Sequence, residues 1–289
     1  MKIKVFKKGF NYSQDGVGNR LIYHLQGCNM NCPWCSNPES INKNGTLMVY
    51  EEWLLDSVCP YGAIRQKRLN RSTCGVCNSK PCVGINKNKG IRFSCEEYEL
   101  EYLLDEAMRC SSLFYEGGGV TLTGGEPTQQ FEAITLLLKD LKKTGIHTAI
   151  ETNATHPRLE KLFPLIDLLI MDFKHYDNEQ HTRITGVGNV IIKENIAKAL
   201  GKHSNVLIRI PLVKGFNSSS EDIANFAAFF KEMNTRSAAF EFLPYHEFGK
   251  IKWLQSGMPY KIENARIEDG ELLQYENIFK NNNLRILHT

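Results

Sequence analysis

Apolar residues along the chain form short bulky runs that alternate with longer segments of helical periodicity. The short runs predict six strands, at residues 20–25, 120–123, 147–150, 168–173, 206–213 and 239–243. The helical periodicity predicts five helices, at residues 96–110, 131–143, 156–165, 189–200 and 220–233. Prolines interrupt the third helix, Gly201 is expected to end the fourth, and a serine at 218–220 is expected to cap the fifth.

Strands that alternate with helices predict a parallel sheet. Six such units over roughly 220 residues favour an α/β fold of the TIM type, an open partial (β/α)6 barrel. A flavodoxin-like open sheet is the competing architecture. Residues 45–95 break the rhythm, with turn formers and five cysteines. We therefore expect residues 1–44 and 96–289 to form the barrel, and residues 45–95 to form a small cysteine-rich insert domain.

Polar groups stand in or just after every predicted strand. In chain order they are Cys28; Gly124, Gly125 and Glu126; Glu151, Thr152 and Asn153; Asp172 and Lys174; Arg209; and His246. One solvated polar residue at a strand end is ordinary, but function in parallel α/β folds lies at the carboxyl ends of the strands. Arg209, between Ile208 and Ile210, is expected to point inward and to meet an anion, because an unpaired buried charge is costly.

The chain has nine cysteines, and eight of them lie between Cys28 and Cys95. An odd, clustered set does not fit a disulfide framework and indicates metal binding. Cys28, Cys32 and Cys35 offer three thiolates, which suit a [4Fe-4S] cluster with one iron left open. Zinc is the alternative, although it favours paired Cys-x2-Cys motifs or histidine partners.

No run of 18 apolar residues predicts a membrane span, and residues 1–8 lack the apolar stretch of a signal peptide. We therefore expect a cytoplasmic protein with no membrane partner. The net charge of +3 is too small to indicate nucleic-acid binding. Residues 61–92, however, carry no acidic residue and eight basic ones: Arg65, Lys67, Arg68, Arg71, Lys80, Lys87, Lys89 and Arg92.

The first cysteine motif, with Trp34 before its third cysteine, resembles the radical S-adenosylmethionine (SAM) superfamily. Its flanks resemble the activating enzymes of glycyl radical enzymes, of the pyruvate formate-lyase activating enzyme type. The segments that carry this resemblance are residues 15–20, 25–39, 117–127 and 243–250. It covers most of the chain outside the insert. Val17 stands where the family usually has proline, which loosens a turn but touches no cluster ligand.

The resemblance implies an oxidoreductase that reductively cleaves SAM to a 5′-deoxyadenosyl radical. This radical would abstract hydrogen from a backbone glycine of a partner glycyl radical enzyme, with flavodoxin or ferredoxin as electron donor. A monomer is expected. A radical SAM enzyme acting on a small molecule or peptide is the alternative, and a non-catalytic electron carrier or zinc scaffold is a third hypothesis.

The resemblance also implies roles for single residues. The SAM site would comprise Trp34, Cys35, Ser36, Asn37, Gly124, Gly125, Glu126, Asp172, Phe173, Lys174, Arg209 and His246. Within it, Gly124 to Glu126 would receive the amino group of SAM and Lys174 its carboxylate, which is also an anion of the kind that the charge argument requires for Arg209. Asp15 would lie near the incoming glycine loop, although an Asp-Gly turn explains it equally well. Glu151, Thr152 and Asp172 resemble a monovalent cation site, but the family has aspartate where this chain has Glu151.

The insert resembles a ferredoxin-like insert that has lost some cysteines. Cys59, Cys74, Cys77 and Cys82 would hold one auxiliary [4Fe-4S] cluster, with zinc as the alternative metal. Cys95 and Cys110 are expected to be structural, and Cys95 is a reserve ligand. The basic residues of the insert would offset the cluster's negative charge or would dock an acidic electron donor.

Overall fold

Six strands run parallel in the order in which the chain presents them. They are β2 (Asn19–Leu25), β8 (Gly119–Gly124), β9 (Thr148–Thr152), β10 (Leu168–Asp172), β11 (Val206–Leu212) and β12 (Ala238–Pro244). Each strand pairs in parallel with the next. The computed structural model, which describes residues 1–56, 59–86 and 90–289, thus has the predicted α/β fold, with a sheet consistent with a partial barrel.

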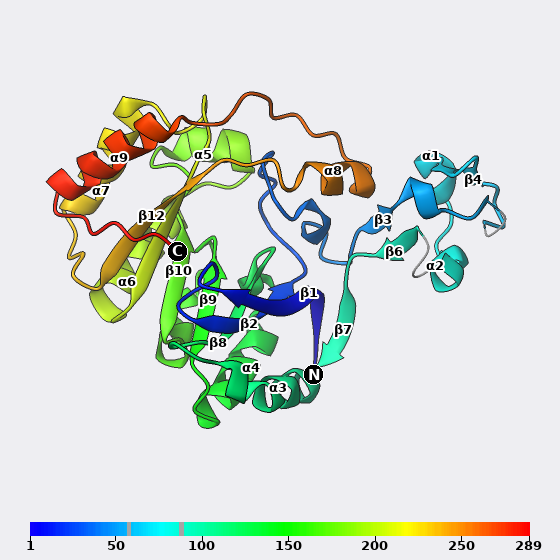
Figure 1. Cartoon of the computed structure of the whole chain (residues 1–289), viewed down its shortest axis with the longest axis horizontal. Helices are drawn as coiled ribbons and strands as arrows, with labels where there is room; N and C mark the ends of the chain where they lie inside the picture. The colour runs from blue at the N-terminus through cyan, green and yellow to red at the C-terminus, as the bar shows by residue number, and fades with distance from the viewer. Residues whose placement is uncertain (57–58, 87–89) are drawn as a thin grey trace.

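Helices follow these strands along the chain and pack outside the sheet (Figure 1). They are α4 (Phe131–Lys143), α5 (Asn178–Thr185), α6 (Val190–Lys202), α7 (Ser220–Lys231) and α9 (Asp269–Asn281). The hydroxyl of Ser219 accepts a hydrogen bond from the backbone of Asp222 and caps α7 as predicted. Gly201 does not end α6, because its backbone stays helical and the helix runs on to Lys202. Residues 156–165 form only a 3-10 segment (Leu159–Leu165), which contains Pro164.

Two antiparallel strands extend the sheet beyond β2. They are β1 (Lys2–Tyr12), which forms a hairpin with β2, and β7 (Glu96–Glu99), which pairs with β1. The predicted helix over residues 96–110 is therefore wrong at its start, and α3 begins only at Leu100 and ends at Arg109. Backbone pairing with β1 overrides the local periodicity, since residues 2–5 of β1 pair in antiparallel register with residues 96–99.

Residues 45–95, called the insert below, form their own small elements beside the main sheet (Figure 1). These are β3 (Leu47–Val49) paired with β6 (Ile91–Phe93), β4 (Ile64–Arg65) paired with β5 (Arg68–Leu69), α1 (Arg71–Gly75) and α2 (Pro81–Asn86). A separate apolar cluster lies beneath them: Val49, Leu54, Ile64, Cys82 and Ile91. Among the described residues, none belongs to a helix that is long and apolar enough to cross a membrane.

The inner face of the parallel sheet has two layers. Its lower layer is the apolar cluster Ala149, Leu168, Ile170, Leu207 and Ala239. Two residues further along the strands, the same face is polar. The strand register pairs His24 with Thr123, and it pairs Arg209 with both Asp172 and Glu241. Glu151 is level with Ile170 in the register, and its carboxylate reaches this polar layer through hydrogen bonds from Thr123 and Arg209. Residues two apart on a strand point to the same face, so the polar layer lies on the same face as the apolar cluster and nearer the carboxyl ends of the strands.

Candidate functional site

A cavity of about 590 Å³ opens at the carboxyl ends of the parallel strands, a size that suits a small-molecule cofactor. It brings together most of the residues predicted from the sequence. These are Asp15, Cys28, Cys32, Trp34, Cys35, Ser36, Asn37, Gly124, Gly125, Glu151, Thr152, Asp172, Lys174, Arg209 and His246. Glu126 and Phe173 do not line it.

The three cysteines lie on the loop that follows β2. The backbone N–H of Met30 donates to Cys28 Sγ (3.4 Å), and that of Asn37 donates to Cys35 Sγ (3.3 Å). Burial raises the pKa of all three thiols, that of Cys32 to about 12. The cavity alone would keep them protonated, so they are poorly suited as free nucleophiles. A bound cationic centre would supply the charge that stabilises thiolates, and N–H···S bonds suit such ligands. The donor set therefore fits an iron–sulfur cluster.

Lys174 and Asp172 form a buried ion pair at the end of β10, with 2.6 Å between Nζ and Oδ2. Burial alone would lower the pKa of Lys174, but the Asp172 carboxylate and the nearby Cys32 raise it above its ordinary value. Lys174 therefore stays positively charged beside the cysteine loop. A cation in this position can bind a carboxylate ligand.

Arg209 crosses the cavity floor and meets two carboxylates of the protein itself. Its Nη1 donates to Glu151 Oε1 (2.6 Å) and its Nε donates to Glu241 Oε2 (2.8 Å). The expected anion is thus supplied within the fold. The charge argument that assigned Arg209 to the SAM carboxylate therefore no longer holds.

Glu126 is fully buried, and its carboxylate makes hydrogen bonds within the protein. Its Oε1 accepts hydrogen bonds from Thr128 and Thr152, and its Oε2 accepts one from the backbone N–H of Asn153. The carboxylate ties the end of β8 to the end of β9 and does not face the cavity. Gly124 and Gly125 border the cavity, whereas the side chain of Glu126 does not, and its contact with the amino group of SAM stays a prediction.

Phe173 was predicted as a cofactor residue, but its side chain does not line the cavity. Phe173 is fully buried and packs against three aromatic rings of α7: Phe226, Phe229 and Phe230. It lies between Asp172 and Lys174, whose side chains face inward, and strand alternation turns the intervening residue outward.

The predicted monovalent cation site does not fit the residues present. Glu151 already accepts hydrogen bonds from Arg209 and Thr123, and Asp172 is paired with Lys174. The hydroxyl of Thr152 donates to Glu126. Both carboxylates are thus already paired with cationic side chains of the chain.

Asp15 lies on the loop between β1 and β2, which folds back into the barrel. The Thr121 hydroxyl donates to the Asp15 carbonyl (2.7 Å), and Asn11 Nδ2 donates to its carboxylate (2.6 Å). Burial and the charge of Glu151 raise the pKa of Asp15. The carboxyl therefore belongs to the cavity wall and is more than part of a surface turn.

Aromatic side chains form the upper wall. Trp34 packs on Phe216, with ring centroids 4.9 Å apart, and His246 stacks on Phe248 at 4.2 Å. Burial lowers the pKa of His246, so its ring is neutral near pH 7. A neutral imidazole and an indole on the cavity wall suit a flat heterocycle.

Of the four predicted cysteines of the insert, Cys82 is the one whose pKa responds to the other three. The pKa of Cys82 is raised by burial and then by the charges of Cys59, Cys74 and Cys77. Backbone N–H groups donate to Cys59 Sγ from Ala63 and to Cys77 Sγ from Lys80, each at 3.3 Å. All nine cysteines are free, and within the described ranges no three His, Cys, Asp or Glu side chains form a ready-made metal site.

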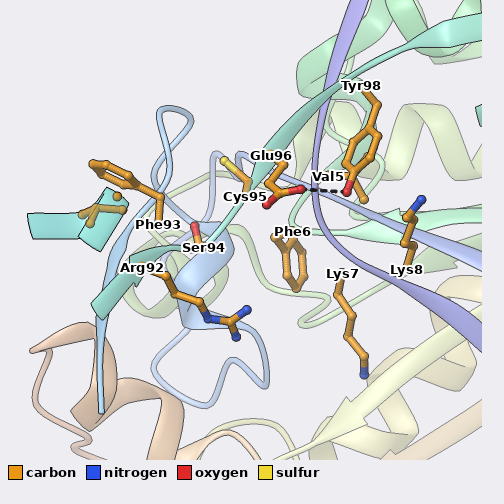
Figure 2. Close-up of a pocket in the computed structure, with 12 residues that line it drawn as sticks. Val5, Phe6, Lys7, Lys8, Arg92, Phe93, Ser94, Cys95, Glu96 and Tyr98 are labelled. Carbon is orange, nitrogen blue, oxygen red and sulfur yellow. Dashed lines mark hydrogen bonds between the residues drawn. The ribbon is translucent and has the colours of Figure 1, made fainter. Parts of the chain in front are cut away.

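Cys95 lies apart from both cysteine sets. It borders a second hollow, of about 480 Å³, between β1, β7 and the insert, where Lys7 and Arg92 also lie (Figure 2). The groups that act on its pKa, after burial itself, are Lys4, Ser94 and Glu97, and none of them is a cysteine. Cys95 is therefore not placed as a ligand with the other four.

Four residues at or beside the cavity were not predicted: His24, Glu241, Lys252 and Trp253. Glu241 lies between Phe240 and Phe242, so the alternation that identified Arg209 would also have identified it. His24 Nδ1 is buried without a hydrogen-bond partner among the described residues, which no local pattern indicates. Lys252 and Trp253 act through contacts with a loop more than 200 residues earlier in the chain.

Comparison with known proteins bears on the same residues. The model of the Radical SAM superfamily matches residues 22–227. The 4-hydroxyphenylacetate decarboxylase activating enzyme of Clostridioides difficile (strain 630) is 32% identical over 288 residues, which cover 93% of this chain and 90% of that protein. The choline trimethylamine-lyase activating enzyme of Oleidesulfovibrio alaskensis is 33% identical over 282 residues, with 91% and 90% covered.

A solved structure agrees with these relatives. A domain of the pyruvate-formate lyase-activating enzyme from Bacteroides vulgatus ATCC 8482 superposes with a TM-score of 0.50 and 27% identity. It covers 59% of this chain and 98% of its own. With a superfamily match over more than half of the chain and relatives above 30% identity over most of it, the chain belongs to the radical SAM superfamily and, within it, to the activating enzymes of glycyl radical enzymes.

Proposed function

We propose that Cys28, Cys32 and Cys35 hold a [4Fe-4S] cluster and that SAM fills the adjoining cavity. The observation that carries this proposal is the opening of all three cysteines into the same cavity as the polar strand ends. Three thiolates leave one iron of such a cluster without a protein ligand, and SAM can occupy that position.

When bound, the cluster supplies one electron to SAM, which separates into methionine and a 5′-deoxyadenosyl radical that takes one hydrogen atom from a backbone glycine of the partner enzyme. The residues of this chain bind and orient the cofactor. Lys174 attracts the carboxylate of SAM. Gly124 and Gly125, which have no side chains, let the amino group approach the backbone. Trp34, Ser36, Asn37 and His246 surround the adenosine.

The partner's glycine loop would enter beside Asp15. The buried carboxyl of Asp15 can hold a backbone N–H of an extended peptide, and Arg209 fixes the neighbouring wall through Gln14. The two relatives are activating enzymes of a decarboxylase and of a lyase, respectively. We propose a glycyl radical enzyme as the partner and a flavodoxin or ferredoxin as the electron donor.

The test uses anaerobically reconstituted protein, reduced with dithionite and mixed with SAM. We expect 5′-deoxyadenosine to form, and Cys32→Ala to abolish it. Cys110→Ala, which alters a cysteine outside the cavity, is the control and should leave the product unchanged. Absence of 5′-deoxyadenosine from the wild type would overturn the proposal. An electron paramagnetic resonance doublet on a co-purified partner would distinguish glycine activation from action on a small molecule.

For the insert, we propose that Cys59, Cys74, Cys77 and Cys82 hold one auxiliary [4Fe-4S] cluster in a ferredoxin-like domain. Support comes from the effect of Cys59, Cys74 and Cys77 on the pKa of Cys82, and from the N–H···S bonds to Cys59 and Cys77. Two clusters require about eight irons per chain, whereas zinc in the insert leaves about four. We expect Cys74→Ala to lower the iron content from about eight to about four. A wild-type content of about four with one zinc would contradict this proposal.

A further inference from the structure

The helix α8 (Lys250–Ser256) lies between the cysteine loop after β2 and the insert (Figure 1). The helix is short and follows β12 by a few residues, yet two of its side chains reach back to the segment around Cys35. The contacts join residues more than 200 positions apart in the chain. They are therefore a product of the tertiary fold.

Trp253 fixes the backbone of Cys35. Its indole Nε1 donates to the Cys35 carbonyl at 2.9 Å, and the side chain is almost fully buried. Gly249, the residue before α8, lies so close that a Cβ there would come within 2.6 Å of the same carbonyl oxygen. The start of the helix is thus pressed against the cysteine loop at a position that only glycine allows.

Lys252 fixes the next part of the loop through two hydrogen bonds and one ion pair of its ammonium group. Its Nζ lies 2.8 Å from the Ser36 carbonyl, 2.7 Å from Asn37 Oδ1 and 3.3 Å from Glu39 Oε1. Glu39 is largely buried, and its second oxygen has no partner among the described residues, so Lys252 is its counter-charge. These contacts hold Ser36 and Asn37, which border the cavity.

The other end of α8 is anchored in the insert. Arg71 Nη2 donates to the Gln255 carbonyl (2.7 Å), and the Ser256 hydroxyl lies 3.2 Å from Met48 Sδ. Gly257 follows the helix with φ +73°, and a Cβ there would clash with Arg71. Arg71 is three residues from Cys74, so one helix contacts both cysteine-bearing segments.

We propose that α8 couples the position of the insert to the conformation of the SAM-binding loop, residues 35–39. Trp253 and Lys252 are positioning residues that hold Cys35 to Asn37 in the conformation that receives the adenosine of SAM, and Arg71 transmits the position of the insert to the same loop. This inference rests on the proposed function for its link to SAM, but the mechanical coupling stands independently of it.

The experiment measures two quantities for each variant of the full reconstituted chain: the rate of amide hydrogen exchange at residues 35–41 and the dissociation constant for SAM. Trp253→Phe keeps the ring and removes only the donor. We expect amide exchange in this segment to rise by about fivefold, as for the loss of one buried hydrogen bond, and the SAM dissociation constant to rise similarly. Lys250→Met is the matched control, because Lys250 is exposed on the same helix and pairs only weakly with Glu247.

Two further variants keep the test decisive. Lys252→Met leaves Glu39 buried without a counter-charge and risks misfolding, so it is combined with Glu39→Gln, which removes the orphaned charge. Arg71→Met should increase exchange at residues 35–41 although Arg71 does not touch them. Unchanged exchange in Trp253→Phe and in the double variant would overturn the positioning role of Trp253 and Lys252. Unchanged exchange in Arg71→Met would overturn the coupling between the insert and the loop. If the wild type does not bind SAM, the proposed function is refuted. Faster exchange in the variants would in that case still support the coupling through α8.

Discussion

At the residue scale, Arg209 is the side chain on which the polar layer depends most. It is almost fully buried and forms ion pairs with both Glu151 and Glu241. Removing one partner from a buried charge group is strongly destabilising, because the remaining charges lose their compensation.

We therefore expect Arg209→Met to lower the free energy of unfolding by about 3–5 kcal/mol at pH 7, measured by urea titration of the apoprotein. Lys143→Met removes an exposed ion pair with Asp140 and should cost at most about 0.5 kcal/mol. A loss for Arg209→Met as small as that of the control would show that the carboxylates are not held by Arg209.

The same variant predicts a pH dependence. Burial alone would raise the pKa of Glu151, but Arg209 lowers it below its ordinary value. A carboxylate with a lowered folded-state pKa contributes stability above its unfolded value, and this contribution is lost as the pH falls through the folded value. The gap between wild type and Arg209→Met should therefore be widest near pH 7 and should shrink below about pH 4.5. A gap that is constant from pH 7 to pH 4 would contradict this assignment.

The inner-face residues show what a sequence can reveal at this scale. Alternation along a strand was enough to place Asp172, Lys174 and Arg209 in the cavity, and it also turns Phe173 outward. The partners of these residues were not predictable, because Glu241 and Glu151 meet Arg209 only after four strands, β9 to β12, have paired in register.

At the element scale, two glycines let the end of β8 approach the cysteine loop. A Cβ on Gly125 would lie 2.4 Å from the Gly27 carbonyl oxygen, and one on Gly124 would lie 2.5 Å from the Leu25 nitrogen. We expect Gly125→Ala to push the loop away, to cost about 1–3 kcal/mol of stability and to reduce the iron bound per chain after reconstitution. Both quantities can be measured on the same preparation.

Gly201→Ala is the control for this variant, since nothing lies within 4 Å of its added Cβ and its backbone is helical. It should be neutral or stabilising by up to about 1 kcal/mol. Full iron incorporation in Gly125→Ala would show that the loop tolerates the displacement.

Elements that depend on local periodicity were predictable, and those that depend on a distant partner were not. The bounds of α4 match the prediction, because its apolar stripe is regular. The strand β7 was predicted as helix, because Glu96 to Glu99 take their conformation from β1 nearly a hundred residues earlier. The helix α8 is likewise stabilised by contacts across the fold.

At the scale of the whole molecule, the order of six parallel strands followed from the sequence, since consecutive βα units place neighbouring strands side by side. The placement of the insert did not follow. Its position depends on Arg71, on α8 and on Ser94, whose hydroxyl donates to the side chain of Gln26. These contacts have no signal in local sequence.

The charge of the insert leads to a prediction about the electron donor. Its exposed basic side chains lie mainly on the hairpin of β4 and β5, which includes Arg65, Lys67 and Arg68. Asp56 holds the turn of this hairpin through the backbone of Gln66 and Lys67. Lys87 and Lys89 lie outside the described residues. Arg71 is half-buried and structural, so it does not belong to the exposed surface.

We expect reversal of Arg65, Lys67 and Arg68 to glutamate to slow reduction by flavodoxin at least about tenfold at low salt, because steering by opposite charge accelerates such encounters. Stopped-flow absorbance of the cluster would measure the rate, and added salt should narrow the difference because it screens exposed charges. Reduction by dithionite should not change. Reversal of Lys139, Lys143 and Lys161, which are exposed far from the insert, makes the same change in net charge and should leave the flavodoxin rate near that of the wild type. Equal slowing by the two triple variants would show that net charge, and not a docking surface on the hairpin, controls the encounter.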